Sequence, residues 1–143
     1  ALEAALRGAC AQADVIITIT SSFAPILKAA EVRPGTHIAC MGTDTVGKQE
    51  VEAELVSRAS VFTDEVAQAV TLGESQHAVA AGLVDAGSIV EIGQVVTGAH
   101  PGRTSAEEIT LFDGTGVGLQ DLAVASAVVD LAVRKGIATE VEF

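Results

Sequence analysis

One run of β-branched residues, Val15-Ile16-Ile17-Thr18-Ile19-Thr20, constrains the fold most, because it shows no polar alternation until its end. Such a run is typical of a strand buried on both faces of a parallel sheet. Further short strands are predicted over residues 36–42, 60–64 and 109–112. Because stretches of helical spacing separate these strands, the sequence predicts an α/β fold with a largely parallel sheet.

Helical periodicity recurs between the strands. Helices are predicted over residues 2–9, 47–58, 65–83 with a break near 73, 89–96 and 119–134. The segment 89–96 is also compatible with a strand, although a short helix is favoured. Gly136 is expected to end the longest helix as a C-cap, and a last short strand is predicted over residues 139–143.

Composition narrows the class of protein and of partner. A chain of 143 residues with 49% hydrophobic content suits a single domain. A net charge of −11 repels phosphate backbones, and four Phe with no Trp or Tyr leave few surfaces on which bases could stack. The apolar runs are far shorter than the ~20 residues of a membrane helix. We therefore expect a small-molecule partner, with no nucleic acid and no membrane.

The two cysteines, Cys10 and Cys40, lie thirty positions apart without a CxxC pairing. No signal sequence precedes them, so we expect two free packing thiols in a reducing, cytoplasmic setting, with no disulfide and no metal site. His37, inside a predicted strand, is expected to be a packing residue as well. Because the chain begins at Ala1 within a helical pattern, we expect it to be a piece of a longer protein.

A polar cluster over residues 41–50 is the strongest local candidate for chemistry. It follows a predicted strand and precedes helical spacing, at the end of the strand where open α/β sheets bind ligands. Asp44 could exchange protons while Lys48 donates to an anionic group. Alternatively, Asp44 could cap a helix that has Lys48 in its first turn. Polar groups also follow two other strands, at Thr20 and Asp64, so these strand ends could form the rim of a ligand cleft.

A glycine run, Gly114-x-Gly116-x-Gly118, offers a second candidate between a strand and a helix. Its backbone amides could cradle a pyrophosphate, as in dinucleotide-binding turns. Against this, the third glycine comes one position too early and Leu119 follows it. Spacing alone does not decide whether the glycine run binds a pyrophosphate or the chemistry lies at the polar cluster over residues 41–50.

Motifs along nearly the whole chain are similar to the carboxyl-terminal half of the ornithine cyclodeaminase and mu-crystallin family. The matching segments are Ala13-Asp14-Val15-Ile16 with Thr20, Pro34-Gly35-Thr36-His37, Gly42-Thr43-Asp44 with Gly47-Lys48-Gln49-Glu50, Glu91-Ile92-Gly93, Pro101-Gly102-Arg103-Thr104, and Phe112-Asp113-Gly114-Thr115-Gly116 with Gln120-Asp121. They occur in the family's order.

This resemblance implies a dimeric NAD(P)-dependent enzyme with a Rossmann domain and a separate domain for substrate binding and dimerisation. Residues 1–143 would form a partial Rossmann-like domain that lacks its first βαβ unit, and residues from about 119 to 143 would return toward the second domain. The phosphate loop and the substrate carboxylate clamp would belong to the preceding half. The glycine run would then lie beside the nicotinamide and the substrate.

The resemblance also implies roles for single residues. Asp44 matches the family's catalytic acid/base, and Thr115 matches a substrate contact. The positions that match cofactor contacts are Thr20, Met41, Gly42, Thr43, Asp44, Lys48 and Gly114. The cyclodeaminase usually has a serine where Gly114 stands, so a side-chain bond to the cofactor is absent here.

The implied chemistry is hydride transfer between an amino acid's α-carbon and nicotinamide, with Asp44 handling protons as an imine forms or is reduced. Cyclodeaminase, imino-acid reductase and amino-acid dehydrogenase activities all fit. Gly114 and the hydroxyl run Thr20-Ser21-Ser22 weaken the case for ornithine, so a reductase or dehydrogenase acting on a small or acidic substrate fits about as well. The competing hypothesis is a non-catalytic NAD(P)H-binding protein like mu-crystallin.

Overall fold

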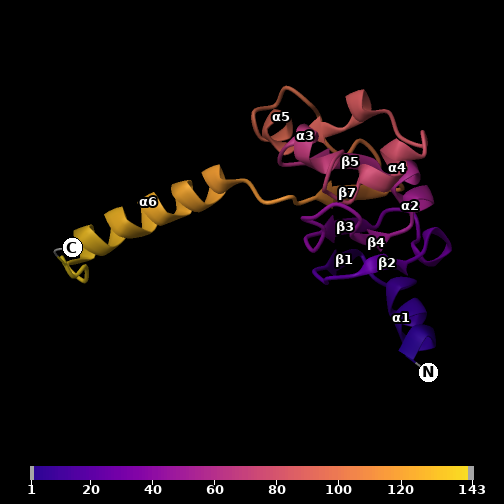
Figure 1. Ribbon diagram of the computed structural model, residues 1–143, viewed down its shortest axis with the longest axis horizontal. Coiled ribbons are helices and arrows are strands. Elements are labelled where there is room, and N and C mark those ends of the chain that lie inside the picture. Colours follow the sequence, from indigo (N-terminus) through magenta and orange to yellow (C-terminus); the bar gives the residue numbers. More distant parts are fainter. Residues whose placement is uncertain (1, 142–143) are drawn as a thin grey trace.

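The computed structural model describes residues 2–141, and its centre is a five-stranded sheet in which every pairing is parallel (Figure 1). The strand order is β1-β3-β7-β5-β6. The strands are β1 (Val15–Thr18), β3 (His37–Cys40), β7 (Thr110–Asp113), β5 (Ser60–Thr63) and β6 (Val90–Glu91). This confirms the predicted α/β fold with a parallel sheet.

Helices lie on both faces of this sheet, apart from the last one, which extends away from it (Figure 1). They are α1 (Leu2–Cys10), α2 (Ala53–Arg58), α3 (Val66–Ala69), α4 (Gln76–Ala80), α5 (Ile92–Val96) and α6 (Gly118–Lys135), with 3-10 turns at Ala29–Glu31 and Ala86–Ser88. The core lies on one face, where Ile38 and Leu111 of the sheet are buried together with Leu55 of α2 and Ala78 of α4. The helix predicted over 2–9 is confirmed as α1. In the segment 89–96, residues 92–96 form the favoured helix as α5, whereas residues 90–91 form the strand β6.

A second, two-stranded parallel sheet joins β2 (Phe23–Leu27) to β4 (Gln49–Val51). The prediction of a helix from residue 47 was therefore wrong, because residues 49–51 form a strand and α2 begins only at Ala53. The acids in this segment resembled the polar face of a helix, yet Glu50 is fully buried. Since no helix begins near Asp44, the helix-cap alternative for that residue is also wrong.

The prediction that the first strand is buried on both faces was wrong as well. The exposed fractions of Val15, Ile17 and Ile19 are 56, 67 and 74%. β1 is an edge strand, so it has a hydrogen-bonded neighbour, β3, on one side only. Its register with β3 places Val15 and Ile17 on the same sheet face as His37, and at β1 no described helix covers that face.

The longest helix, α6, extends away from the rest of the structure (Figure 1). Its apolar side chains are exposed, including Leu119 and Leu122. Gly136 ends it with a left-handed φ of 65°, which confirms the predicted C-cap. Residues 139–141 do not form the predicted last strand, and residues 142–143 lie outside the described part. No helix within residues 2–141, α6 included, is long and apolar enough to cross a membrane.

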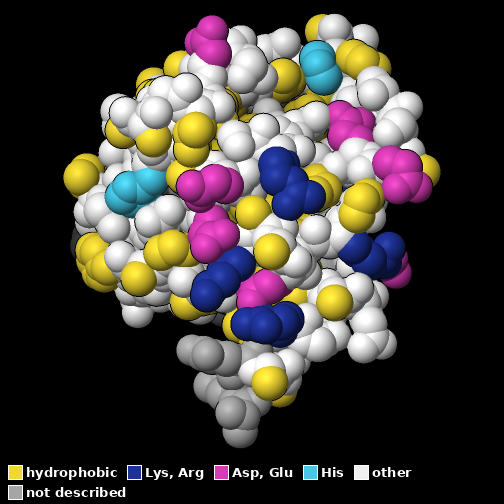
Figure 2. Space-filling view, turned by 90° about the vertical axis from the view of Figure 1, so that its right-hand side faces the viewer, with side chains coloured by type: hydrophobic (Ala, Val, Ile, Leu, Met, Phe, Trp, Pro, Cys, Tyr) yellow, Lys and Arg dark blue, Asp and Glu magenta, His cyan; other side chains and the backbone are white. Residues whose placement is uncertain are grey.

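Charged side chains of both signs are interspersed on the side of the molecule that carries α1 and α2 (Figure 2). Arg7 of α1 pairs with Glu31 at 3.3 Å, and Arg33 pairs with Asp14. The cations on this side stand apart or beside acids, and this view shows no extended basic surface (Figure 2).

Glu108, next to β7, gives a testable stability prediction. Its carboxylate accepts hydrogen bonds from the Ser60 hydroxyl and from the amides of Thr104 at 2.6 Å and Ser105 at 3.3 Å. These bonds, that of Ser60 foremost, lower the pKa of Glu108 to about 2.

Because the folded-state pKa is depressed, the stabilisation is complete above the unfolded glutamate pKa of about 4.3 and is lost as the pH falls toward 2. We expect Glu108→Gln to lower the melting temperature of the full-length protein at pH 7 and to weaken its dependence on pH below about 4.3. Thermal melts at several pH values, with the neighbouring exposed Glu107→Gln as control, check this. Parallel shifts for both variants would contradict it.

Candidate functional site

The carboxyl ends of the parallel strands bring the predicted site residues to one edge of the sheet. The ends of β1, β3, β5 and β7 meet there because all four strands run the same way. The residues that follow these strands are Thr20, Met41, Gly42, Thr43, Asp44, Asp64, Gly114 and Thr115. The sheet therefore assembles the three polar strand ends that the sequence placed far apart.

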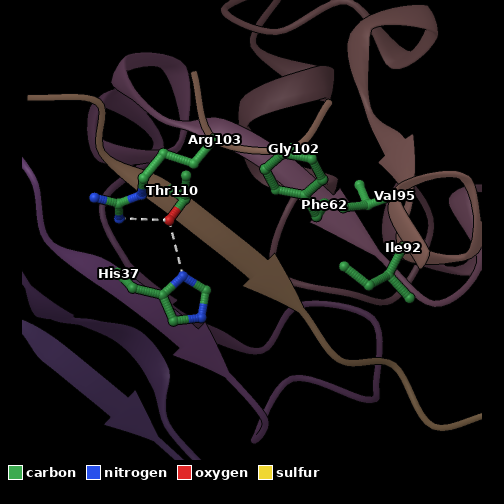
Figure 3. A pocket seen from close by; sticks show the side chains of 7 residues that line it. All are labelled: His37, Phe62, Ile92, Val95, Gly102, Arg103 and Thr110. Carbon is green, nitrogen blue, oxygen red and sulfur yellow. Dashed lines mark hydrogen bonds between the residues drawn. The ribbon is translucent and has the colours of Figure 1, made fainter. Parts of the chain in front are cut away.

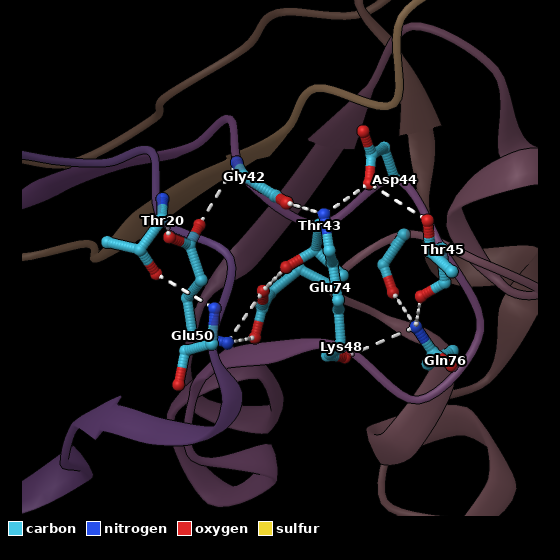
Figure 4. Close-up of polar contacts among 11 residues, drawn as sticks. Thr20, Gly42, Thr43, Asp44, Thr45, Lys48, Glu50, Glu74 and Gln76 are labelled. Atoms are coloured by element: carbon cyan, nitrogen blue, oxygen red, sulfur yellow. Dashed lines mark hydrogen bonds and ion pairs between the residues drawn. The ribbon is translucent and has the colours of Figure 1, made fainter.

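Asp44 and Lys48 form an ion pair in the loop after β3 (Figure 4). Lys48 Nζ lies 2.7 Å from Asp44 Oδ1 and 3.4 Å from the carbonyl oxygen of Gly42. The Lys48 side chain is 17% exposed, whereas that of Asp44 is 61% exposed. The hydrogen bond from Lys48, aided by Thr45, lowers the pKa of Asp44. The loop thus presents an ionised carboxylate that can accept a proton.

Beneath this loop, the buried carboxylate of Glu50 joins the ends of β1 and β3. It accepts hydrogen bonds from the Thr18 hydroxyl at 2.7 Å, the Thr20 amide at 2.5 Å and the Gly42 amide at 3.1 Å. The two strand ends approach so closely that a Cβ on Gly42 would lie 2.3 Å from the carbonyl oxygen of Thr20. Only glycine fits at position 42.

The carboxylate of Glu74 binds the backbone of β4, as that of Glu50 binds the ends of β1 and β3. Its carboxylate accepts bonds from the amides of Glu50 at 2.9 Å and Val51 at 2.8 Å, and from the Thr43 hydroxyl. Burial raises the pKa of Glu74 although these bonds oppose the shift. Thr43 is fully buried, with its hydroxyl directed at Glu74. Any contact of Thr43 with a ligand would therefore have to come from its backbone.

Asp113, the last residue of β7, holds Glu74 in turn. It accepts bonds from the amides of Glu74 and Ser75, both at 2.9 Å, and from the Ser75 hydroxyl at 2.8 Å. Burial raises the pKa of Asp113. We refer to Asp64, Asp113, Glu74 and Glu50 together as the carboxylate chain, since each binds the backbone of a neighbouring segment.

Asp64 completes the carboxylate chain at the glycine run. It accepts bonds from the Thr115 amide at 3.1 Å, the Thr115 hydroxyl at 2.6 Å and the Gly116 amide at 2.9 Å. Burial opposes these bonds, yet together they lower the pKa of Asp64. Two amides that a pyrophosphate would need already bind a carboxylate, which argues against a phosphate loop at residues 114–118. The hydroxyl of Thr115, predicted to contact substrate, faces Asp64.

Met41 and Gly114 pack against each other at the ends of β3 and β7. A Cβ on Gly114 would lie 2.6 Å from Met41 Sδ and 2.8 Å from its Cε. The Met41 side chain therefore lies over the place where a serine at position 114 would project. Met41 is also 42% exposed, so its thioether forms an apolar surface at this edge of the sheet.

Sequence reasoning missed the structural roles of Glu50, Glu74 and Asp113. Asp113 directly follows a predicted strand, which was a usable signal. Glu50 and Glu74 gave none, because their partners are scattered along the chain and only the fold brings them together.

A separate pocket of about 280 Å³ lies on the sheet face that carries His37, Phe62 and Thr110 (Figure 3). Phe62, Ile92 and Val95 form its apolar wall. His37 Nδ1 lies 2.8 Å from the Thr110 hydroxyl, which also receives a bond from Arg103 at 2.9 Å. Burial, aided by the charge of Arg103, lowers the pKa of His37. His37 is thus a hydrogen-bonded packing residue, as predicted, and lies away from Asp44.

Comparison with known proteins agrees with this fold. A profile of the ornithine cyclodeaminase/mu-crystallin family matches residues 4–136, which confirms the resemblance drawn from the motifs. The chain is 63% identical over 132 residues to iminosuccinate reductase of Paracoccus denitrificans, covering 92% of this chain and 41% of that protein. It is 40% identical over 131 residues to alanine dehydrogenase of Archaeoglobus fulgidus, covering 91% and 41%.

The crystal structure of the Paracoccus denitrificans iminosuccinate reductase in complex with NAD+ superposes with a TM-score of 0.91 at 61% identity. The match covers 96% of this chain and 42% of that one. The chain therefore spans about two fifths of the length of these relatives.

The carboxylate chain predicts the effect of Glu50→Gln. An amide in place of the carboxylate directs an NH2 group at one of the three donors, and a buried donor without an acceptor costs about 1–3 kcal/mol. We expect the full-length variant to lose stability by that amount. Hydrogen exchange should accelerate in peptides spanning Thr20 and Gly42. Glu54→Gln on the exposed side of α2 is the matched control. Unchanged exchange at both segments would contradict the role of Glu50.

The packing of Met41 on Gly114 predicts that Gly114→Ser displaces the methionine. Overpacking costs about 1–3 kcal/mol, and we expect the low end because the methionine side chain is flexible and half-exposed. The double variant Met41→Ala/Gly114→Ser should recover most of this loss in thermal melts. Gly93→Ser, where no atom lies within 4 Å of an added Cβ, is the control. Additive effects of the two substitutions would show that the residues do not interact.

Proposed function

The chain belongs to the ornithine cyclodeaminase/mu-crystallin family, and we propose that it forms most of the NAD(P)-binding domain of an enzyme acting on amino or imino acids. The reaction is hydride transfer at the substrate's α-carbon, with formation or reduction of an imine. The observation that carries the proposal is the Asp44–Lys48 pair, an ionised and accessible carboxylate at the ligand-binding edge of a parallel sheet.

The residues described here suit the nicotinamide end of NAD or NADP and not its pyrophosphate. The edge near Asp44 carries Gly42 and Gly114, which have no side chain, and the apolar thioether of Met41. The amides of Thr115 and Gly116 are bound to Asp64. We propose that Thr20, Met41, Gly42, Thr43, Lys48 and Gly114 border the cofactor, and that the phosphate loop belongs to another part of the full-length protein.

When bound, the cofactor supplies the hydride acceptor or donor. In the oxidative direction, the Asp44 carboxylate takes the proton that the substrate's ammonium group must lose before hydride can leave the α-carbon. In the reductive direction, it lies beside the cationic imine nitrogen and stabilises that charge. Lys48 lowers the pKa of Asp44 and holds its carboxylate in place. Met41 provides an apolar wall that limits water near the reacting atoms.

The substrate class follows from the relatives that carry reductase and dehydrogenase names. The high identity to iminosuccinate reductase makes a small acidic imino acid, formed from oxaloacetate and ammonia, the first substrate to test. We propose that Thr115 borders the substrate. A cyclodeaminase activity on a diamino acid is the second activity to test, because the family takes its name from it.

Other features of the full-length protein are proposed from exposed apolar surface. We propose that α6 and the residues up to 143 lead into a second domain for substrate binding and dimerisation, because Leu119 and Leu122 are exposed on a helix that leaves the sheet. A homodimer would bury such surface. The buried free thiols Cys10 and Cys40 suit a cytoplasmic location.

We expect Asp44→Asn in the full-length protein to lower kcat by at least about a hundredfold, since acid–base groups contribute 10²–10⁴. NADH and NADPH binding, followed by nucleotide fluorescence, should persist. Turnover is measured with oxaloacetate plus ammonia and with cyclic imino acids. Glu54→Gln is the control.

Retained turnover in Asp44→Asn would contradict the role of Asp44. Nucleotide binding with no turnover of any amino or imino acid by the parent would instead support the mu-crystallin-like alternative.

A further inference from the structure

The loop that carries Asp44 and Lys48 is held by the first turn of α4, which comes from a distant part of the sequence. The loop reverses at Gly47, whose φ of +87° favours glycine. The amide of Lys48 donates to the carbonyl of Thr45 at 3.2 Å. These local contacts close the turn. They do not by themselves fix the turn relative to the sheet.

Gln76, the first residue of α4, binds three backbone groups of this loop (Figure 4). Its side-chain oxygen accepts a bond from the Gly47 amide at 2.7 Å. Its Nε2 donates to the carbonyls of Lys48 at 3.3 Å and Thr45 at 3.4 Å, and to that of Gly73 at 2.9 Å. Gln76 is only 8% exposed, so these bonds are shielded from competing water.

His77 binds the same loop from the next position. Its Nε2 lies 3.0 Å from the carbonyl oxygen of Lys48. A carbonyl can only accept, so this nitrogen carries the proton and donates. The Lys48 carbonyl therefore accepts two hydrogen bonds, one from Gln76 and one from His77.

Fixing the Lys48 backbone fixes the origin of its side chain. From that origin the ammonium donates to Asp44 Oδ1 at 2.7 Å and to the carbonyl oxygen of Gly42 at 3.4 Å. A lysine side chain is flexible, and without a fixed backbone it would spend part of its time in water. The pairing that lowers the pKa of Asp44 thus depends on the position of the main chain at residues 45–48.

We propose that Gln76 and His77 are positioning residues for the active site: by holding the backbone at Gly47 and Lys48, they keep the Lys48 ammonium on the Asp44 carboxylate. This inference rests on the proposed function of Asp44. It assigns to α4 a role in chemistry at a loop about thirty residues away in the chain.

The charged groups around the loop indicate that Lys48 controls the protonation of Asp44. Lys48 is the cation in contact with Asp44 among the described residues. Glu74 faces Thr43, and Glu50 faces the Gly42 amide, so both acids are bound to the segment just before Asp44. His77 faces the Lys48 carbonyl. Moving the ammonium away would remove the hydrogen bond and the positive charge that lower the pKa of Asp44, so that pKa would rise.

The test compares four variants of the full-length enzyme. Gln76→Met and His77→Leu keep side-chain size and remove the bonds, whereas His77→Gln keeps a donor. Lys48→Met removes the cation itself and serves as the reference. The measurements are kcat, KM and the pH profile of kcat, from pH 8 down to the lowest pH at which each variant stays folded, together with nucleotide binding and thermal melts.

We expect Gln76→Met and His77→Leu to lower kcat about tenfold or more with a smaller change in KM, because misplacement of reacting groups mainly affects kcat. The acid limb of the profile should move to higher pH, in the direction given by Lys48→Met. His77→Gln should stay close to the parent. In the Lys48→Met background, substituting Gln76 or His77 should add no further shift.

An unchanged acid limb in a folded Gln76→Met or His77→Leu variant would overturn the proposal, even if kcat falls, because a purely structural role predicts that outcome. An additional shift in the Lys48→Met background would overturn it too. If Gln76→Met does not fold, His77→Leu tests the same carbonyl contact separately. Failure of the proposed function looks different, since Asp44→Asn would then retain turnover whatever the Gln76 and His77 variants do.

Discussion

The structure depends on buried carboxylates that bind backbone amides. Burying a charged group is costly unless hydrogen bonds replace its water. In the carboxylate chain, Glu50, Glu74, Asp113 and Asp64 each accept bonds from amides or hydroxyls of another segment, and no buried side-chain N or O atom among the described residues lacks a partner. The ends of β1, β3, β4, β5 and β7 are thereby joined through side chains where the sheet's own hydrogen bonds stop. The edge of the sheet becomes rigid at the place where ligands bind in this class of fold.

This arrangement separates structural acids from the one suited to chemistry. The members of the carboxylate chain have their oxygens occupied by protein donors, so they have little capacity left for a substrate. Asp44 differs, because it stands on the outside of the loop, is largely exposed and is paired with a single cation, Lys48. The residues beneath it supply a fixed platform, while α4 supplies the contacts that orient the loop. A catalytic carboxylate needs this kind of support, since small displacements of reacting groups reduce rates strongly.

Sequence patterns predicted what local periodicity controls. The β-branched run at 15–20 gave a strand, the spacing after Gly118 gave α6, and Gly136 gave its C-cap. Patterns failed where a distant segment decides the outcome. Glu50 looked like a solvated helix residue. It is instead a buried residue of β4 whose carboxylate binds Thr18, Thr20 and Gly42. Val15 and Ile17 looked doubly buried, yet β1 is an edge. Spacing could not choose between a cap and a reacting group at Asp44. The family resemblance favoured the reacting group, and the strand β4 then excluded the cap.

The central claim is that Asp44 handles the proton of the reacting nitrogen at the carboxyl edge of the sheet. The most direct test is a crystal structure of the full-length protein with NADH and the product amino acid. We expect the nicotinamide to lie along residues 41–44, with the amino group within about 3 Å of an Asp44 carboxylate oxygen. A nicotinamide bound away from this edge, for example in the pocket beside His37, or an amino group bound to a different acid, would contradict it.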